Sequence, residues 1–175
     1  GLAPQQFHLF FVGSLIGGEG CDILSQAFGI VASRDVRFYL LAVGPRTKGE
    51  NPSLDEGFIN VLIKELEGKP ASRMILLPGL IQDRERLAEL YRASDLFVFP
   101  SRKEGLPSVL LEAMAAGLVP IVSDLPVFRS IIQQDVNGII VPSEDAGALA
   151  ESLLRASEDW GLRQRIGKSA RESVL

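Results

Sequence analysis

The stretch FPSRKEGLPSVLLEAMAAG, residues 99–117, decides how this chain is expected to fold. An apolar run ends at Phe99, a polar segment follows, and an apolar helical pattern begins near Pro107. Pro has no N–H to lose at the first helical position, and Gly suits the residue that ends a helix. The stretch therefore predicts a strand, a loop and a helix from Pro107 to Gly117. The free N–H groups at the start of this helix should face the end of the strand.

Six short, β-rich apolar runs punctuate the whole chain, at residues 7–12, 37–43, 73–77, 96–99, 119–122 and 138–141. Most are nearly continuous in hydrophobicity rather than alternating, which is typical of parallel strands covered on both faces. Helical patterns lie between them, so strand and helix alternate. This order predicts an α/β fold with a Rossmann-like, doubly wound parallel sheet and right-handed crossovers.

The helical patterns can be placed from their spacing and their stop signals. Apolar residues recur at helical spacing from Ile23 to Val31, from Phe58 to Leu66 and from Leu87 to Tyr91. Two more helices are expected at about 145–157 and 161–172. Asp83 and Ser143 are predicted N-caps, because each is a capping residue type just before a helical pattern.

In such a sheet the ligand binds at the carboxyl ends of the strands, near the switch point between the first and fourth strands. The loops after Val12, Val43, Leu77 and Phe99 are therefore the predicted site. Of these, the loop 100–107 leads directly into the helix that begins near Pro107. Backbone N–H groups at such a helix start can hold a phosphate without any basic side chain.

Two glutamates flank this helix start. Glu104 lies in the loop and Glu112 about two turns along the helix, and a carboxylate accepts hydrogen bonds from two sugar hydroxyls. Gly105, which has no side chain, would let a ligand approach the main chain closely. The apolar residues after Glu112 predict its partial burial. The alternative is structural, with Glu104 capping the helix and Glu112 solvated on its surface.

Composition excludes several other classes of function. The formal net charge of −4 disfavours nucleic acid as a partner. A single Cys21 excludes internal disulfides and suits a reducing compartment, and no Cys/His cluster has metal-ligand spacing. No apolar run approaches the ~20 residues that span a bilayer. The helical pattern continues to the last residue without a stop signal, so we expect residues 1–175 to be a single domain of a longer, two-domain protein.

The segment EGLPSVLLEAMAAG resembles the E-x(7)-E motif of retaining GT-B glycosyltransferases, in glycosyltransferase family 4, or glycosyl transferases group 1. FVGSL, LYRASDLFVFPS, IVSDLPVFRSII and NGIIVP resemble further segments of that family in the same order. A lone E-x(7)-E is weak evidence, whereas this collinear set covers nearly the whole chain. The resemblance implies the C-terminal, donor-binding half of a GT-B fold.

The resemblance also implies roles for the matching residues. Glu104 would be the catalytic residue that binds the hydroxyls of the sugar, and Glu112 would bind the ribose. The remaining donor-binding residues would act mainly through the backbone: Gly13 and Ser14 at the diphosphate, Gly79, Leu80 and Ile81 at the nucleobase, and Gly105, Leu106, Pro107 and Ser108 at the sugar and diphosphate. The substrate would be a nucleoside diphosphate sugar, a UDP- or GDP-sugar, with no cofactor and no metal.

One position departs from the family pattern. Glu19 stands where a Lys is usual in the first loop, which reverses the charge near the expected diphosphate. Either Lys48, Arg102 or Lys103 supplies the compensating charge, or the enzyme holds its substrate differently, or the domain is degenerate. The degenerate case makes a non-catalytic nucleotide-binding or interaction module the alternative function.

Other expectations follow from the leading hypothesis, that of a hexosyltransferase half. Its partner would be an N-terminal acceptor domain outside this chain, without which the isolated domain should be inactive. The enzyme would be cytoplasmic, with contact at the inner membrane face made only through the full-length protein. A nucleotide-sugar epimerase or a phosphorylase could share the architecture. The E-x(7)-E motif argues against an epimerase. The lack of a Lys placed to hold pyridoxal phosphate argues less firmly against a phosphorylase.

Overall fold

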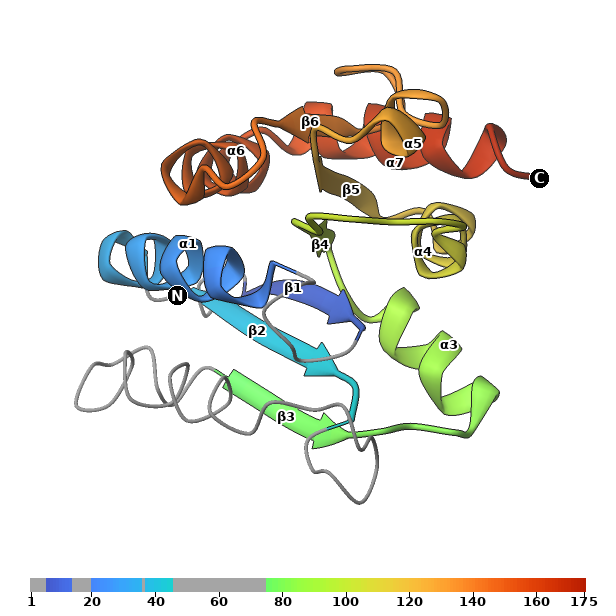
Figure 1. Cartoon of the computed structure of the whole chain (residues 1–175), viewed down its shortest axis with the longest axis horizontal. Helices are drawn as coiled ribbons and strands as arrows, with labels where there is room; N and C mark the ends of the chain where they lie inside the picture. The colour runs from blue at the N-terminus through green and yellow to red at the C-terminus, as the bar shows by residue number, and fades with distance from the viewer. Residues whose placement is uncertain (1–5, 14–19, 36, 46–74) are drawn as a thin grey trace.

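A computed structural model describes residues 6–13, 20–35, 37–45 and 75–175 (Figure 1). Within these ranges six parallel strands form one sheet in the order β3-β2-β1-β4-β5-β6. The prediction of a doubly wound sheet with its switch point between the first and fourth strands is confirmed. The strands are β1 (Phe7–Val12), β2 (Phe38–Val43), β3 (Ile75–Gly79), β4 (Leu96–Phe99), β5 (Val119–Ser123) and β6 (Ile139–Val141).

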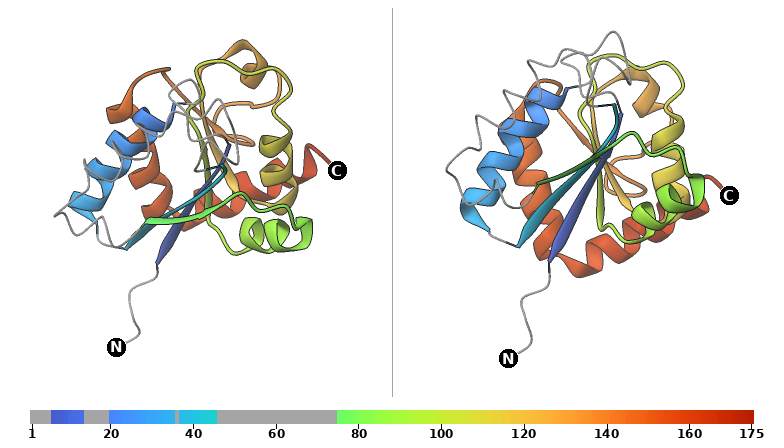
Figure 2. Two further views of the ribbon diagram at one scale, coloured as in Figure 1. Left: turned by 60° about the horizontal axis from the view of Figure 1, so that its bottom comes forward. Right: turned by 90° about the horizontal axis from the view of Figure 1, so that it is seen from below.

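Helices cover both faces of the sheet (Figure 2). On one face α1 (Cys21–Arg34) packs against α6 (Ala146–Glu158). On the other, α3 (Arg84–Arg92) packs against α4 (Ser108–Ala116). The last helix, α7 (Trp160–Glu172), contacts α6, β5 and α4, and the short helix α5 (Pro126–Arg129) lies between β5 and β6. The two layers explain why the strands read as continuous apolar runs.

Burial is complete along two neighbouring strands of the sheet, β4 and β5. Aromatic rings fill the space between the sheet and its helices, among them Phe10, Phe97 and Phe128, which have no solvent exposure. The ring of Tyr91 on α3 meets Phe10 edge-on, with 4.8 Å between ring centroids. Such pairs prefer this geometry, so the aromatic packing helps to fix α3 against the sheet.

Aspartates cap three of the helices. The Asp83 carboxylate accepts the N–H groups of Glu85 and Arg86, so the predicted cap of α3 is confirmed. The predicted cap at Ser143 is wrong. Helix α6 begins two residues later, and its cap is Asp145, which accepts the N–H of Ala148. A run of several capping residue types leaves the choice open in sequence, and the backbone path decides it.

Other boundaries moved by one or two residues. The third strand was predicted at 73–77 and lies at Ile75–Gly79. Pro107 is the N-cap of α4 rather than its first helical residue. Gly117 ends this helix, as predicted, and it has the left-handed conformation. The pattern did not predict α5, which is only one turn long. The expected helix at 58–66 lies outside the described residues, and in the described part no helix is long and apolar enough to cross a membrane.

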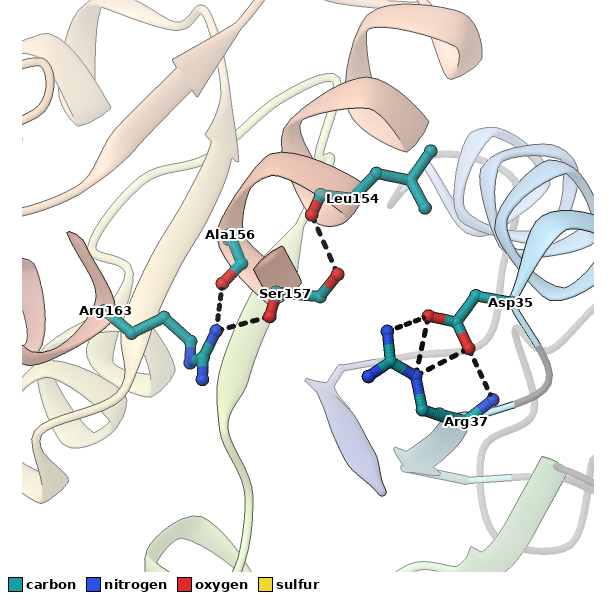
Figure 3. A network of polar contacts seen from close by, with 6 residues as sticks. All are labelled: Asp35, Arg37, Leu154, Ala156, Ser157 and Arg163. Carbon is teal, nitrogen blue, oxygen red and sulfur yellow. Dashed lines mark hydrogen bonds and ion pairs between the residues drawn. The ribbon is translucent and has the colours of Figure 1, made fainter. Parts of the chain in front are cut away.

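A buried arginine joins α7 to the end of α6 (Figure 3). The Arg163 guanidinium donates to the carbonyl oxygens of Ala156 and Ser157, both at 2.6 Å, and lies over the ring of Phe7. Burial lowers the pKa of Arg163 below its usual value. These carbonyls have no partner within the helix, so the guanidinium satisfies them and fixes the turn between the two helices.

Gly20 provides the close contact that sets the start of α1 beside β4. It has φ 72°, and a Cβ built there would lie 1.8 Å from the carbonyl oxygen of Pro100. A side chain would therefore face both a strained conformation and a backbone atom that cannot move aside easily.

We predict that Gly20→Ala destabilises the fold by about 2–4 kcal/mol, because strain and steric overlap add. Urea unfolding at neutral pH measures this loss. Gly161→Ala is the matched control, since its Cβ would meet nothing closer than Asp159 Oδ1 at 3.4 Å, and a helical Ala stabilises by up to about 1 kcal/mol. Equal unfolding midpoints for the Gly20 variant and the parent would contradict the prediction.

Candidate functional site

The ends of three neighbouring strands meet at glycines. The Gly13 N–H donates to the carbonyl oxygen of Val43, and the Gly44 N–H donates to that of Gly79. A Cβ at Gly44 would lie 1.9 Å from the carbonyl oxygen of Gly13, so the chains approach as closely as backbones allow. The carboxyl edge beside the switch point is therefore lined by main chain. Ser14, predicted to act with Gly13, lies outside the described residues.

Helix α4 begins at this edge without a side-chain cap. Its N-cap is Pro107, whereas carboxylates cap α3, α6 and α7. The Ser108 N–H is donated to the carbonyl oxygen of Leu106 at 2.9 Å. Among the described residues, no acceptor meets the N–H groups of Gly105, Leu106 and Val109. Unpaired N–H groups together with the positive end of the helix dipole favour an anionic ligand here.

The loop before α4 exposes its tip and buries its base. Leu106 is 82% exposed and Gly105 is exposed, whereas Ser101 has no solvent exposure. Apart from Gly105 and its two neighbours in the chain, no heavy atom lies within 4 Å of the position of a Cβ built at Gly105. Glu104 is half-buried, and its Oε1 accepts a hydrogen bond from the Ser101 hydroxyl at 3.0 Å. The Glu104 side chain is therefore attached to the buried base of the loop while its neighbours face open space.

Glu112 lines a cavity between α3 and α4. The cavity has a volume of about 560 Å³, and Ile81, at the start of the loop into α3, lines it as well. Two residues predicted to bind the nucleoside thus share one hollow, although Gly13 and Glu104 are not among its lining residues. The expected partial burial of Glu112 is wrong, because the side chain is exposed. The apolar residues after it, Ala113 and Met114, face the core instead.

Tyr91 forms part of the wall behind Glu112. Its ring is buried, and its hydroxyl donates to the carbonyl oxygen of Val109 at 3.3 Å. Burial, and next the nearby Glu112 carboxylate, raise the pKa of Tyr91 far above its usual value. The phenol therefore stays neutral, and it can offer the cavity a hydrogen-bonding group but no charge.

Arg102 holds the loop to α1. Its guanidinium makes two hydrogen bonds of 2.7 Å with the carboxylate of Asp22 and lies 3.4 Å from Glu144. The Arg102 hydrogen bond holds the pKa of Asp22 below its usual value. Arg102 is therefore a half-buried, ion-paired residue rather than a solvated loop charge. Two carboxylates lie close to its charge, and Glu19 and Lys48 lie outside the described residues.

His8, the one histidine of the sequence, lies away from this edge. The Nδ1 atom of His8 is 3.6 Å from Asp95, near the amino end of β1 and so at the opposite edge of the sheet. Cys21 is buried in the core. No group of three His, Cys, Asp or Glu side chains that could hold a metal ion occurs in the described ranges.

Sequence reasoning missed three contacts at the site, those of Ser101, of Arg102 and of Tyr91. Each depends on a residue distant in sequence: Ser123, Asp22 and Glu112 respectively. No spacing rule relates such pairs. The one available signal was the position of Ser101 directly after a buried strand end, where a hydroxyl must find a partner.

The chain is similar to known glycosyltransferases over nearly its whole length. It is 38% identical over 174 residues to an uncharacterized glycosyltransferase of Methanocaldococcus jannaschii, covering 99% of this chain and 42% of that protein. It is 35% identical over 166 residues to the GDP-mannose:cellobiosyl-diphosphopolyprenol alpha-mannosyltransferase of Xanthomonas campestris, covering 93% and 41%. The chain thus spans about two fifths of the length of these relatives.

The fold agrees with this similarity. The crystal structure of the C-terminal domain of a glycosyl transferase group 1 family protein from Francisella tularensis superposes with a TM-score of 0.86. The match covers 98% of this chain and 85% of that one, at 23% identity. The sequence model of one family matches residues 1–173. The chain therefore belongs to the family described as glycosyl transferases group 1 and has the fold of the C-terminal domain of a GT-B glycosyltransferase.

Proposed function

We propose that this chain is the donor-binding domain of a retaining glycosyltransferase, which transfers a hexose from a nucleoside diphosphate sugar to an acceptor. The observation that carries the proposal is the uncapped start of α4, with Glu104 just before it and Glu112 about one turn along the helix. Family membership supports sugar transfer as the reaction. The relative from Xanthomonas campestris is named for GDP-mannose, which supports a nucleotide sugar as substrate.

The helix start would stabilise the leaving group. As the bond between the anomeric carbon and the phosphate oxygen breaks, the diphosphate takes the electron pair and its negative charge grows. The N–H groups of Gly105, Leu106 and Val109 have no other acceptor in the described residues. They could stabilise that charge by donating hydrogen bonds to the diphosphate oxygens. The acceptor oxygen forms the new bond to the anomeric carbon, and a base outside this chain takes its proton. Because the domain uses backbone amides, its net charge of −4 is no obstacle.

The two carboxylates would divide the recognition of the substrate. Glu104, beside the open space at Gly105, would accept hydrogen bonds from hydroxyl groups of the sugar. Glu112 would accept hydrogen bonds from the ribose hydroxyls inside the cavity between α3 and α4, and the nucleobase would lie beside Ile81. A volume of about 560 Å³ lies in the usual range of small-molecule sites. UDP- and GDP-sugars both remain candidates, without a cofactor or a metal.

A second candidate function is a degenerate module that no longer transfers sugar. Glu19 favours it, because a carboxylate near the diphosphate would repel the ligand by about 4 kcal/mol at 4 Å and an effective dielectric of 20. Calorimetric titration of the chain with UDP, GDP and ADP, and with their sugar conjugates, separates the two functions. Saturable binding to one base, tightened by its sugar, supports the donor domain, and no binding by the folded chain supports the module.

We predict that Glu112→Ala weakens binding of free nucleotide and of nucleotide sugar alike, by about tenfold or more, since a hydrogen bond to a charged group contributes roughly 1.5–3 kcal/mol. Glu104→Ala should weaken only the sugar conjugate. Calorimetry measures both, with Glu151→Ala on α6, across the sheet, as a surface-glutamate control. Equal losses for both ligands in both site variants would rule out this division.

Gly105 offers a test that separates ligand binding from stability. A Cβ there meets no protein atom within 4 Å, and the residue is not in the left-handed region, so Gly105→Ala should leave thermal stability unchanged. The same methyl group should hinder a ligand that lies against the main chain and weaken nucleotide-sugar binding by about tenfold, as overpacking costs roughly 1–3 kcal/mol. Gly161→Ala should alter neither property. Unchanged affinity of the Gly105 variant would place the ligand elsewhere.

We also predict that residues 1–175 alone transfer no sugar, because the chain covers only 42% of its relative from Methanocaldococcus jannaschii and the acceptor-binding half is proposed to lie outside it. A product assay with radiolabelled UDP-glucose or GDP-mannose and simple glycoside acceptors checks this. Transfer above the level given by the Glu104→Ala variant would overturn the prediction.

A further inference from the structure

Two buried serines connect the central sheet to Glu104. Ser123 is the last residue of β5, where it pairs with Val141 of β6, and only 1% of its surface is exposed. Ser101 is the second residue after the end of β4 and has no solvent exposure. Buried hydroxyl groups cost free energy unless they are hydrogen-bonded, so the partners of these two side chains matter.

The first hydrogen bond fixes the backbone of the loop. The Ser123 hydroxyl donates to the carbonyl oxygen of Ser101, at the point where the chain leaves the sheet. Ser123 itself is paired with Val141 of β6, and the preceding residue, Val122, is paired with Phe99 of β4. Ser101 is therefore attached to a fully buried strand, although the following residues reach an exposed tip at Leu106.

The second hydrogen bond reaches the carboxylate. The Ser101 Oγ lies 3.0 Å from Glu104 Oε1 and 3.1 Å from the carbonyl oxygen of Lys103. A hydroxyl group has one proton and can donate fully to only one of them. The ionised carboxylate is the stronger acceptor, because hydrogen bonds to charged groups are stronger than neutral ones. The proton of Ser101 therefore belongs to Glu104, and the bond selects one position for that side chain.

We propose that Ser101 is a positioning residue that holds the Glu104 carboxylate ready for the sugar hydroxyls, with Ser123 as its support. The proposal rests on the proposed function, in which Glu104 binds the sugar. A glutamate side chain that is free to rotate must be ordered when the ligand binds, and this ordering lowers affinity. Ser101 orders it beforehand. The contribution should appear for ligands that carry the sugar and not for those that lack it.

The test compares matched ligands in matched variants. Ser101→Ala should weaken binding of UDP-glucose or GDP-mannose by roughly three- to tenfold and leave binding of UDP or GDP unchanged. Ser101→Thr keeps a hydroxyl and should restore most of the loss. Ser123→Ala should also weaken binding of the nucleotide sugar, since it removes the hydrogen bond to the carbonyl oxygen of Ser101. This variant tests the proposal if a Ser101 variant does not fold.

Ser157→Ala is the matched control. Ser157 is likewise a buried serine, 5% exposed, whose hydroxyl donates to a carbonyl oxygen, that of Leu154, but it lies on α6 across the sheet from α4 (Figure 3). Loss of the Ser157 hydroxyl should lower thermal stability about as much as loss of the Ser101 hydroxyl. It should not change the ratio of the affinity for the nucleotide sugar to that for the free nucleotide. Equal losses for nucleotide and nucleotide sugar in Ser101→Ala, or no loss for either, would overturn the proposal.

A measurement without ligand separates the proposal from the proposed function. Side-chain three-bond couplings in NMR report how many rotamers Glu104 populates. We expect one rotamer in the parent and in Ser157→Ala, and averaging in Ser101→Ala. If the parent binds no nucleotide at all, the proposed function fails, and the couplings alone decide the role of Ser101. Identical Glu104 couplings in the parent and Ser101→Ala would show that Ser101 does not position this carboxylate.

Discussion

The parallel pairing of β1 with β4 is the contact on which the rest of the molecule depends. Leu9 and Phe10 lie beside Leu96 and Phe97, and the pairing is strengthened where the His8 N–H donates to the Asp95 carboxylate while the Asp95 N–H donates to the His8 carbonyl oxygen. At this junction the order of strands reverses, so the loops after β1 and β4 leave the sheet toward opposite faces. This topology places the carboxyl ends of β1 and β4 side by side, whichever side chains the loops carry.

Backbone groups dominate this edge of the sheet. Three glycines close the strand ends, and α4 starts without the carboxylate cap that α3, α6 and α7 possess. A carboxylate at that position would occupy the N–H groups and repel an anion. Leaving the helix uncapped costs some stability, typically about 1 kcal/mol, and keeps the N–H groups available. Arg102 and Ser101 then hold the loop from opposite sides, through Asp22 on α1 and through Ser123 in the sheet.

Part of the candidate site could be predicted from sequence because its signals are local. Pro107, Gly117 and the spacing of Glu104 from Glu112 predicted the α4 helix and the order of the groups around its start. The burial of the two glutamates could not be predicted in the same way, because it depends on how the helix and the loop pack. Glu112 is exposed because the helix turns Ala113 and Met114 toward the core, and Glu104 is half-buried because Ser101 binds it. The cap of α6 was misplaced for a similar reason, since several adjacent residues could have served and the backbone path selected Asp145.

The sequence by itself determined the alternation of strands and helices, the parallel sheet, the position of its switch point and membership of a glycosyltransferase family, because hydrophobic periodicity and short motifs act over a few neighbouring residues. Only the tertiary structure decided which side chains hold the site in shape. Asp22 and Arg102 are 80 residues apart, and Ser101 and Ser123 are 22 apart. Such contacts depend on how the crossovers bring distant loops to one edge of the sheet, and neither partner's sequence neighbourhood identifies the other.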